Sequence, residues 1–79
     1  MATKAFVLIE TAVGKAKEVV DTLRKVRGVV SVDAVTGPYD IIAVLEADNL
    51  HAIGDLVARE IHTTAGITRT ITCMAIDLS

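Results

Sequence analysis

The sequence predicts a single α+β domain whose elements follow the order β-α-β-β-α-β. Two kinds of segment alternate along the chain: short apolar runs rich in β-branched residues, which are typical of strands, and segments in which apolar residues recur every three or four positions, as on one face of a helix. Because 79 residues can build only one hydrophobic core, we expect one domain over residues 1–79.

The first strand is expected at residues 4–10, an apolar run too short for a helix. The segment after it predicts an amphipathic helix, because its apolar residues form one stripe and charged residues fill the opposite face. The stripe consists of Val13, Ala16, Val20 and Leu23, with Val19 and Val26 beside it. Arg27-Gly28 is expected to end this helix, since glycine readily adopts the left-handed conformation of a C-terminal cap.

Residues 29–35 and 39–47 are predicted as two strands of a hairpin, because the turn between them is too short for a parallel crossover. Asp48 or Asn49 is expected to cap a second helix. The apolar stripe of that helix comprises Leu50, Ile53, Leu56/Val57 and Ile61. The last strand is expected over residues 67–78, where every second residue is at first a threonine.

This order fits a ferredoxin-like fold, in which four antiparallel strands carry two helices on one face. A strand that exposes one face to water should alternate apolar and polar residues, but the first and third strands are apolar on both faces. In the third strand one face carries Tyr39, Ile41, Ala43 and Leu45, and the other carries Ile42 and Val44. We therefore expect a second copy to cover the face that the helices leave open, giving a sheet-to-sheet dimer.

Composition excludes several partners. The formal charge is −2, with no cluster of Lys or Arg, which argues against nucleic acid as a direct partner. The longest apolar runs, residues 5–9 and 41–45, are far shorter than the ~20 residues that span a bilayer. The chain opens with no signal-peptide pattern, and its single cysteine, Cys73, cannot form an internal disulfide, so we expect a cytoplasmic protein. We expect Cys73 to be a buried, inert thiol.

The sequence contains no catalytic constellation, no metal-ligand spacing and no phosphate-binding glycine loop, so we expect a protein that is not an enzyme and has no cofactor. His51 and His62 are the only histidines. Eleven positions apart on one helix, they would lie ~16 Å from each other, too far for one metal ion. Two histidines on the polar face of the helix are the favoured interpretation.

Two features carry possible binding chemistry. The first is Gly37-Pro38-Tyr39-Asp40 at the hairpin tip: either these are ordinary turn residues with a solvated acid, or Asp40 and the aromatic ring receive an ammonium group. The second is the row formed by Thr68, Thr70 and Thr72, which share one side of the last strand. The row is either ordinary β-propensity or a set of hydroxyl donors for a carboxylate.

Three segments in this order resemble a known family: residues 26–30 (Val-Arg-Gly-Val-Val), 36–42 (Thr-Gly-Pro-Tyr-Asp-Ile-Ile) and 66–72 (Gly-Ile-Thr-Arg-Thr-Ile-Thr). Together they resemble the effector-binding RAM domain of the Lrp/AsnC transcriptional regulators, over essentially the whole chain. Those regulators carry a helix-turn-helix domain before this module, whereas only residues 1–3 precede the first strand here. The sequence is therefore expected to be a stand-alone RAM domain.

The resemblance implies a dimer that joins others into rings, often octamers, with an amino-acid effector bound in clefts where dimers meet. Gly37, Tyr39 and Asp40 match the effector cleft, with Asp40 facing the α-ammonium group. Thr70 and Thr72 match the positions that meet the α-carboxylate. Pro38 has no N–H, so its backbone amide cannot donate a hydrogen bond to a ligand. Full-length Lrp/AsnC regulators are a further partner that the resemblance suggests.

The leading hypothesis is thus a non-enzymatic, amino-acid-binding oligomerisation module that regulates amino-acid metabolism without binding DNA itself. One alternative is a small dimeric ferredoxin-like enzyme of the cofactor-free monooxygenase type, which would need a roomy cavity with polar or aromatic groups. The absence of Trp and the single Phe disfavour that alternative. A purely structural oligomer is the third hypothesis, since fold does not determine function.

Overall fold

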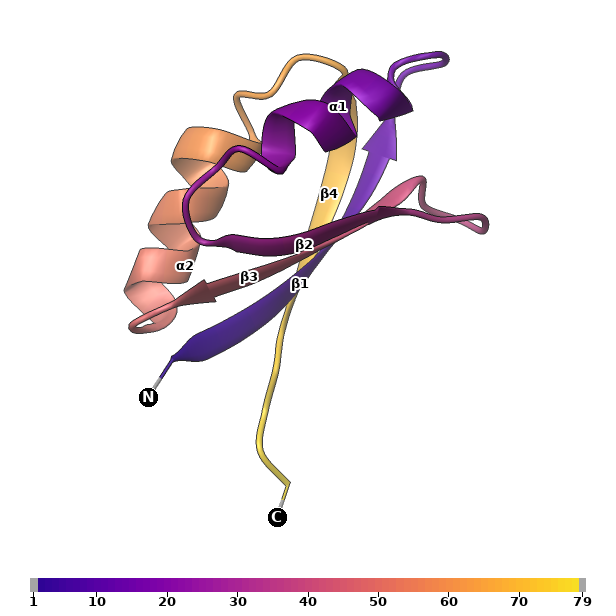
Figure 1. Ribbon diagram of the computed structural model, residues 1–79. Helices are drawn as coiled ribbons and strands as arrows, with labels where there is room; N and C mark the ends of the chain where they lie inside the picture. Colours follow the sequence, from indigo (N-terminus) through magenta and orange to yellow (C-terminus); the bar gives the residue numbers. More distant parts are fainter. Residues whose placement is uncertain (1, 79) are drawn as a thin grey trace.

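A computed structural model describes residues 2–78, and the two end positions of the predicted 1–79 domain lie outside the described residues. The elements are β1 (Thr3–Thr11), α1 (Ala16–Leu23), β2 (Val29–Ala34), β3 (Ile41–Ala47), α2 (Leu50–Leu56), a π-helical turn η1 (Val57–Ile61) that continues α2, and β4 (Ile67–Met74). The predicted order β-α-β-β-α-β is confirmed (Figure 1).

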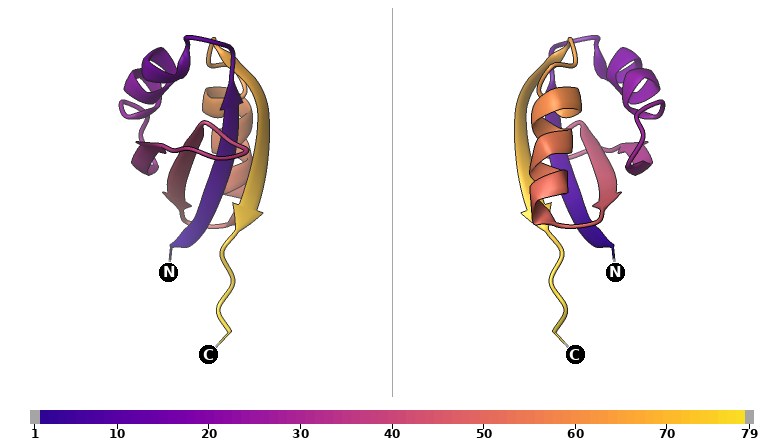
Figure 2. Two further views of the ribbon diagram at one scale, coloured as in Figure 1. Left: turned by 90° about the vertical axis from the view of Figure 1, so that its right-hand side faces the viewer. Right: turned by 90° about the vertical axis from the view of Figure 1, so that its left-hand side faces the viewer.

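The four strands form one sheet in the order β2-β3-β1-β4, and every neighbouring pair is antiparallel. Both helices lie on the same side of the sheet (Figure 2), as the ferredoxin-like prediction requires. Strand β4 forms one edge and β2 the other. No helix in the described part of the chain is long and apolar enough to cross a membrane.

The core lies between the sheet and the helices and is built from aliphatic side chains. Alternate residues of β1 and β3 face it, and the helices contribute their apolar stripes. Its largest fully buried members are Ile9, Leu23, Ile41, Leu45, Ile53, Ile61, Val7 and Val19. The predicted division of β3 into two faces is confirmed, because Ile41, Ala43 and Leu45 are completely buried whereas Ile42 and Val44 are only half-buried.

Helix α1 is shorter than the sequence predicts. Val13 does not join the apolar stripe but lies fully exposed in the turn after β1, where Gly14 has a φ of +79°. The helix ends at Leu23. The chain then makes a turn in which Val26 N–H donates to the carbonyl of Leu23. Gly28 does adopt a left-handed conformation, with φ +97°, but it leads directly into β2 instead of capping the helix.

The start of α2 confirms one prediction and corrects another. The Asn49 side chain caps the helix by accepting a 2.8 Å hydrogen bond from the backbone N–H of Ala52. Leu50 does not belong to the apolar stripe, because it lies on the first turn with 65% of its surface exposed. Ile53, Val57 and Ile61 face the core as predicted.

The sheet face away from the helices carries a band of apolar side chains, which we call the open-face cluster. Its members are Phe6, Leu8, Ile42, Val44 and Ile71, which the strand register places in two adjacent rows across β3, β1 and β4. Charged residues border these rows: Glu10 and Arg69 at one end, Lys4 and Glu46 at the other. The prediction that both sheet faces are apolar is therefore confirmed.

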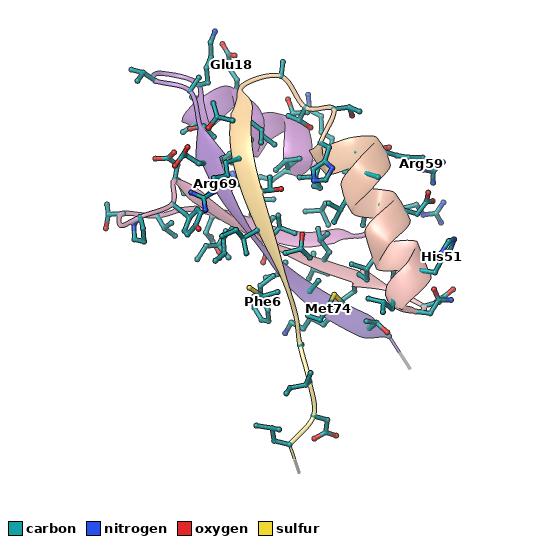
Figure 3. All side chains as sticks on the ribbon, turned by 180° about the vertical axis from the view of Figure 1, so that it is seen from behind. Phe6, Glu18, His51, Arg59, Arg69 and Met74 are labelled. Carbon is teal, nitrogen blue, oxygen red and sulfur yellow. The ribbon has the colours of Figure 1, made fainter. Side chains whose placement is uncertain are left out.

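Cys73 corrects the prediction of a buried thiol. It pairs with Phe6 in the register, so it belongs to the open face, and it is exposed in the single chain. Figure 3 shows the two sides of β4, with Phe6 and Arg69 on one side and Met74 on the other, toward α2. Because strand residues alternate between faces, Thr70 and Thr72 lie on the helix side, opposite the core-facing Ile9 and Val7.

Strand β4 is shorter than predicted and ends at Met74. Residues 75–78 continue in an extended conformation away from the domain (Figure 1), and at the start of this segment Ala75 N–H donates to the carbonyl of Lys4. No strand of the described chain pairs with this segment beyond that point, so it does not satisfy the definition of a sheet strand.

Candidate functional site

The hairpin tip between β2 and β3 holds the first half of the predicted site. Its backbone is tied to the sheet at Asp40, whose N–H donates to the carbonyl of Ile9 and whose carbonyl accepts from Val35 N–H, both at 2.9 Å. These bonds fix the position of Asp40 beside the end of β1. The residues just before it are outside the ladder, and Gly37 there has a φ of +136°, a conformation that side-chain-bearing residues rarely adopt.

The Asp40 carboxylate is neither a freely solvated turn acid nor an unoccupied receptor. Its Oδ2 accepts a 2.8 Å hydrogen bond from the backbone N–H of Thr11 and a 3.3 Å bond from the Thr11 hydroxyl. Among the described residues nothing donates a hydrogen bond to its second oxygen, Oδ1. The group therefore has a structural role at the end of β1 and retains one oxygen for a further donor.

Tyr39 and Gly37 precede Asp40 in the hairpin tip and differ in exposure. Tyr39 precedes Asp40 directly and is half-buried, so part of its ring remains accessible. Gly37 is exposed, and a Cβ built on it would meet nothing within 4 Å. Space is therefore open at Gly37 in the tip of the hairpin.

The second half of the predicted site lies on β4. Thr70 pairs with Ile9 and Thr72 with Val7, two residues that face the core, so both threonines point to the helix side of the sheet. Thr70 is half-buried and Thr72 is exposed. Thr68 differs from them, because it sits at a bulge in the β1–β4 ladder and its hydroxyl lies 3.1 Å from both the carbonyl and the Oε1 of Glu10.

Within one chain the structure does not bring the two halves together. Asp40 lies beside β1 on its β3 side, and the threonines lie across β1 on edge strand β4. Two strand spacings amount to ~10 Å, further than the few ångströms between the ammonium and carboxylate groups of one amino acid. No hydrogen bond between described residues connects the halves.

Sequence reasoning missed two residues that contact the predicted set. Thr11 binds the Asp40 carboxylate, although the two are 29 positions apart, and no sequence pattern links them. His62, the residue that ends the α2–η1 helix, places its Nε2 3.3 Å from the Thr70 hydroxyl. His51 has no such contact and lies at the opposite end of the helix (Figure 3).

The described residues hold no metal-binding group of three or more His, Cys, Asp or Glu side chains, and they line no pocket. A shifted pKa is found at Asp21, which lies on α1, away from the predicted site. The hydrogen bond from Lys17, at 2.9 Å, lowers the pKa of the Asp21 carboxyl below its ordinary value, and the charge of Lys17 acts in the same direction. This is an exposed i,i+4 ion pair on α1, which is a common feature of helix surfaces.

Residues 4–78 match the model of the Lrp/AsnC ligand binding domain. The chain belongs to the Lrp/AsnC family. An HTH-type transcriptional regulator of Pyrococcus furiosus, described as uncharacterized, is 31% identical over 78 residues, which cover 95% of this chain and 52% of that protein. The chain thus spans about half the length of this curated relative.

Solved structures of similar proteins have the same fold. A hypothetical protein from Pyrococcus horikoshii is 34% identical, with a TM-score of 0.88 over 96% of this chain and 90% of that one. A transcriptional regulator from Neisseria meningitidis, solved as a complex with L-Met, is 19% identical, with a TM-score of 0.85 over 96% of this chain and 51% of that one. At that identity the second similarity shows the fold alone. The Pyrococcus furiosus relative is a transcriptional regulator, which is consistent with the expectation of a non-enzymatic domain.

Proposed function

We propose that this Lrp/AsnC domain is a non-enzymatic assembly module that binds a free α-amino acid at sites completed by more than one copy of the chain. The observation that carries the proposal is the match to the Lrp/AsnC ligand binding domain over residues 4–78, together with a site whose two halves lie apart in one chain. The sheet-to-sheet dimer is the unit of assembly, and dimers join into an octamer or a similar ring.

The open-face cluster supports the dimer. Five large apolar side chains form one continuous band on a face that no described element covers. Contiguous apolar patches of this kind, bordered by charged residues, are typical of protein–protein interfaces. A second copy is the partner that matches the patch, because a two-fold axis places the same apolar band on both sides of the interface.

The chemistry of the two halves supports an amino-acid effector. Asp40 offers one carboxylate oxygen for an ammonium group, and the neighbouring Tyr39 ring adds a cation–π surface. Thr70 and Thr72 offer hydroxyl donors for a carboxylate. In the assembled protein, the hairpin tip of one copy and strand β4 of another would then hold opposite ends of one zwitterion. The L-Met complex of the Neisseria meningitidis regulator is an example of such a ligand on the same fold.

A thermal-shift screen with the twenty standard L-amino acids tests this function. A ligand that binds only the folded protein stabilises it by ~2.7 kcal/mol when present at a hundredfold excess over its Kd. We expect one or a few related amino acids to raise the Tm. If no amino acid raises it, the effector-binding function is wrong and the purely structural role is favoured.

We also propose that the domain acts on transcription only through partners such as full-length Lrp/AsnC regulators. Its charge of −2 and lack of a basic patch give it no electrostatic attraction to phosphates. In a gel-retardation assay the domain alone should not retard duplex DNA at 50 mM salt. Retardation with a steep salt dependence would contradict this part of the proposal.

A further inference from the structure

Residues 75–78, which we call the arm, carry two of the most exposed apolar side chains of the described chain. Ile76 exposes 76% of its surface and Leu78 exposes 87%. Single apolar residues on a surface are normal, and Val13, alone in a turn, is of that kind. Ile76 and Leu78 differ, because they lie two positions apart in one extended segment and therefore share one side of it. The arm thus presents an apolar stripe to its surroundings.

The arm starts at the edge of the open-face cluster. Ala75 N–H donates to the carbonyl of Lys4 at 2.9 Å, and the Lys4 ammonium lies 5.3 Å from the centre of the Phe6 ring. Cys73, two residues before Ala75, pairs with Phe6 in the register. From there the arm continues the line of β4 past the start of β1 (Figure 2). It therefore begins beside Phe6, the most exposed side chain of the cluster.

The open-face cluster alone is small for a stable dimer. Phe6 exposes 37% of its surface, and the other four members expose less. With ~200 Å² for an aromatic side chain, the five together expose less than ~400 Å². A standard interface covers ~800 Å² on each partner, of which ~65% is apolar in homodimers, or ~500 Å². A stable dimer therefore needs further apolar surface from each copy, and the arm can supply it.

We propose that the arm crosses to the second copy of the dimer, where Ile76 and Leu78 pack on the sheet that faces its own. Its reach is sufficient, because four extended residues span ~13 Å and two packed sheets lie ~10 Å apart. A two-fold axis makes the exchange mutual, so each dimer buries two arms. This inference rests on the sheet-to-sheet dimer of the proposed function and adds the segment that completes its interface.

The arm's own domain offers no comparable place for these side chains. The described residues line no pocket that Ile76 or Leu78 could fill by folding back. A second copy, in contrast, brings an equivalent open-face cluster next to the point where the arm leaves its sheet.

The first experiment measures the dissociation constant of the dimer by sedimentation over a dilution series. It compares the wild type, the double variant Ile76→Ser with Leu78→Ser, and Val13→Ser. Serine removes apolar surface without adding charge, and Val13→Ser is the matched control because it changes an equally exposed residue outside the arm. Circular dichroism checks that each variant is folded.

We expect the dissociation constant of the double variant to rise at least tenfold and that of Val13→Ser to stay unchanged. The double variant removes four apolar side chains from each dimer. A quarter of the free energy of full burial for each of them is enough for about a tenfold change.

The second experiment follows the arm directly. The chain has no tryptophan, so Leu78→Trp places a single fluorescent reporter on the arm. In the dimer its emission should lie at a shorter wavelength than that of Val13→Trp, the exposed control. Combining Leu78→Trp with Val44→Asp, which places an acid in the open-face cluster and should separate the copies, should return the emission to the wavelength of the control.

Two results would overturn the arm exchange while leaving the proposed dimer intact: a rise of less than tenfold in the double variant, or a Leu78→Trp emission equal to that of the control in the dimer. Emission that stays at short wavelength in monomeric Leu78→Trp with Val44→Asp would also overturn it, since the arm would then pack on its own domain. A wild type that sediments as a monomer at micromolar concentration would refute the proposed dimer itself, and this inference with it.

Discussion

Val44→Asp on the open face should break the dimer. Val44 lies in the middle of the open-face cluster, opposite Phe6 of β1 and Ser31 of β2. In a two-fold interface each substitution appears twice, so two carboxylates would be buried without partners. An ionised carboxylate costs far more to bury than a neutral polar group, so each acid would protonate on burial. Each buried neutral carboxyl then costs ~1–3 kcal/mol on the scale of protein mutational data, or ~2–6 kcal/mol for the dimer. The dimer dissociation constant should therefore rise by roughly 30-fold to over 10,000-fold.

Light scattering after gel filtration measures the mass directly at micromolar concentration. The wild type should elute as a dimer or a larger assembly, and Val44→Asp should shift toward the monomer. Val13→Asp is the matched control, because Val13 is fully exposed in a turn and should keep the wild-type mass. Ile71→Asp on edge strand β4 provides a second test if Val44→Asp does not fold. A wild-type monomer, or folded open-face variants that keep the wild-type mass, would refute the interface.

Two further predictions concern the fold. Gly66→Ala should destabilise the domain by ~1–3 kcal/mol, because Gly66 has a φ of +96° and a Cβ there would lie 3.1 Å from both Lys15 Cβ and Val19 Cγ2. Gly54→Ala should instead stabilise it by ~0.5–1 kcal/mol, since Gly54 lies in α2 and a Cβ added there would meet nothing within 4 Å. Thermal unfolding measures the Tm of both variants, and equal Tm changes would contradict this account. Asp21 has a lowered pKa in the folded state, so its contribution to stability is present above the ordinary value of 3.8 and is lost as the pH falls through the folded value. In an NMR titration, Lys17→Met should return the pKa of Asp21 toward 3.8, and an unchanged pKa would show that Lys17 is not the cause.

Much of the fold was predictable because it follows from local rules. The apolar alternation in β3 identified the buried and open faces, and the Asn49 cap followed from its position before an apolar stripe. The errors lie at the ends of elements. The periodicity of α1 continues through Val26, but the helix stops at Leu23 and Val26 N–H donates to the Leu23 carbonyl in the turn that follows. Leu50 fits the stripe of α2 and is nevertheless exposed on the first turn.

The candidate site was predictable only as a set of residues. The turn chemistry located Gly37, Tyr39 and Asp40 at one hairpin tip, and period two placed Thr70 and Thr72 on one side of β4. Their partners were not predictable, because the bond from Thr11 to Asp40 and that between His62 and Thr70 join different elements. Such contacts depend on strand order and helix placement, which no local pattern encodes.

Calorimetric titration of Asp40→Asn with the amino acid that most raises the Tm tests the central claim most directly. Asn keeps an oxygen that can accept the Thr11 N–H, so the variant should remain folded, and it removes the charge that would receive the ammonium group. Affinity should fall by ~1.5–3 kcal/mol, at least about tenfold, whereas Thr72→Val should lose only ~0.5–1.5 kcal/mol. Wild-type affinity in folded Asp40→Asn would contradict the account and leave Asp40 with its structural role at the end of β1 alone.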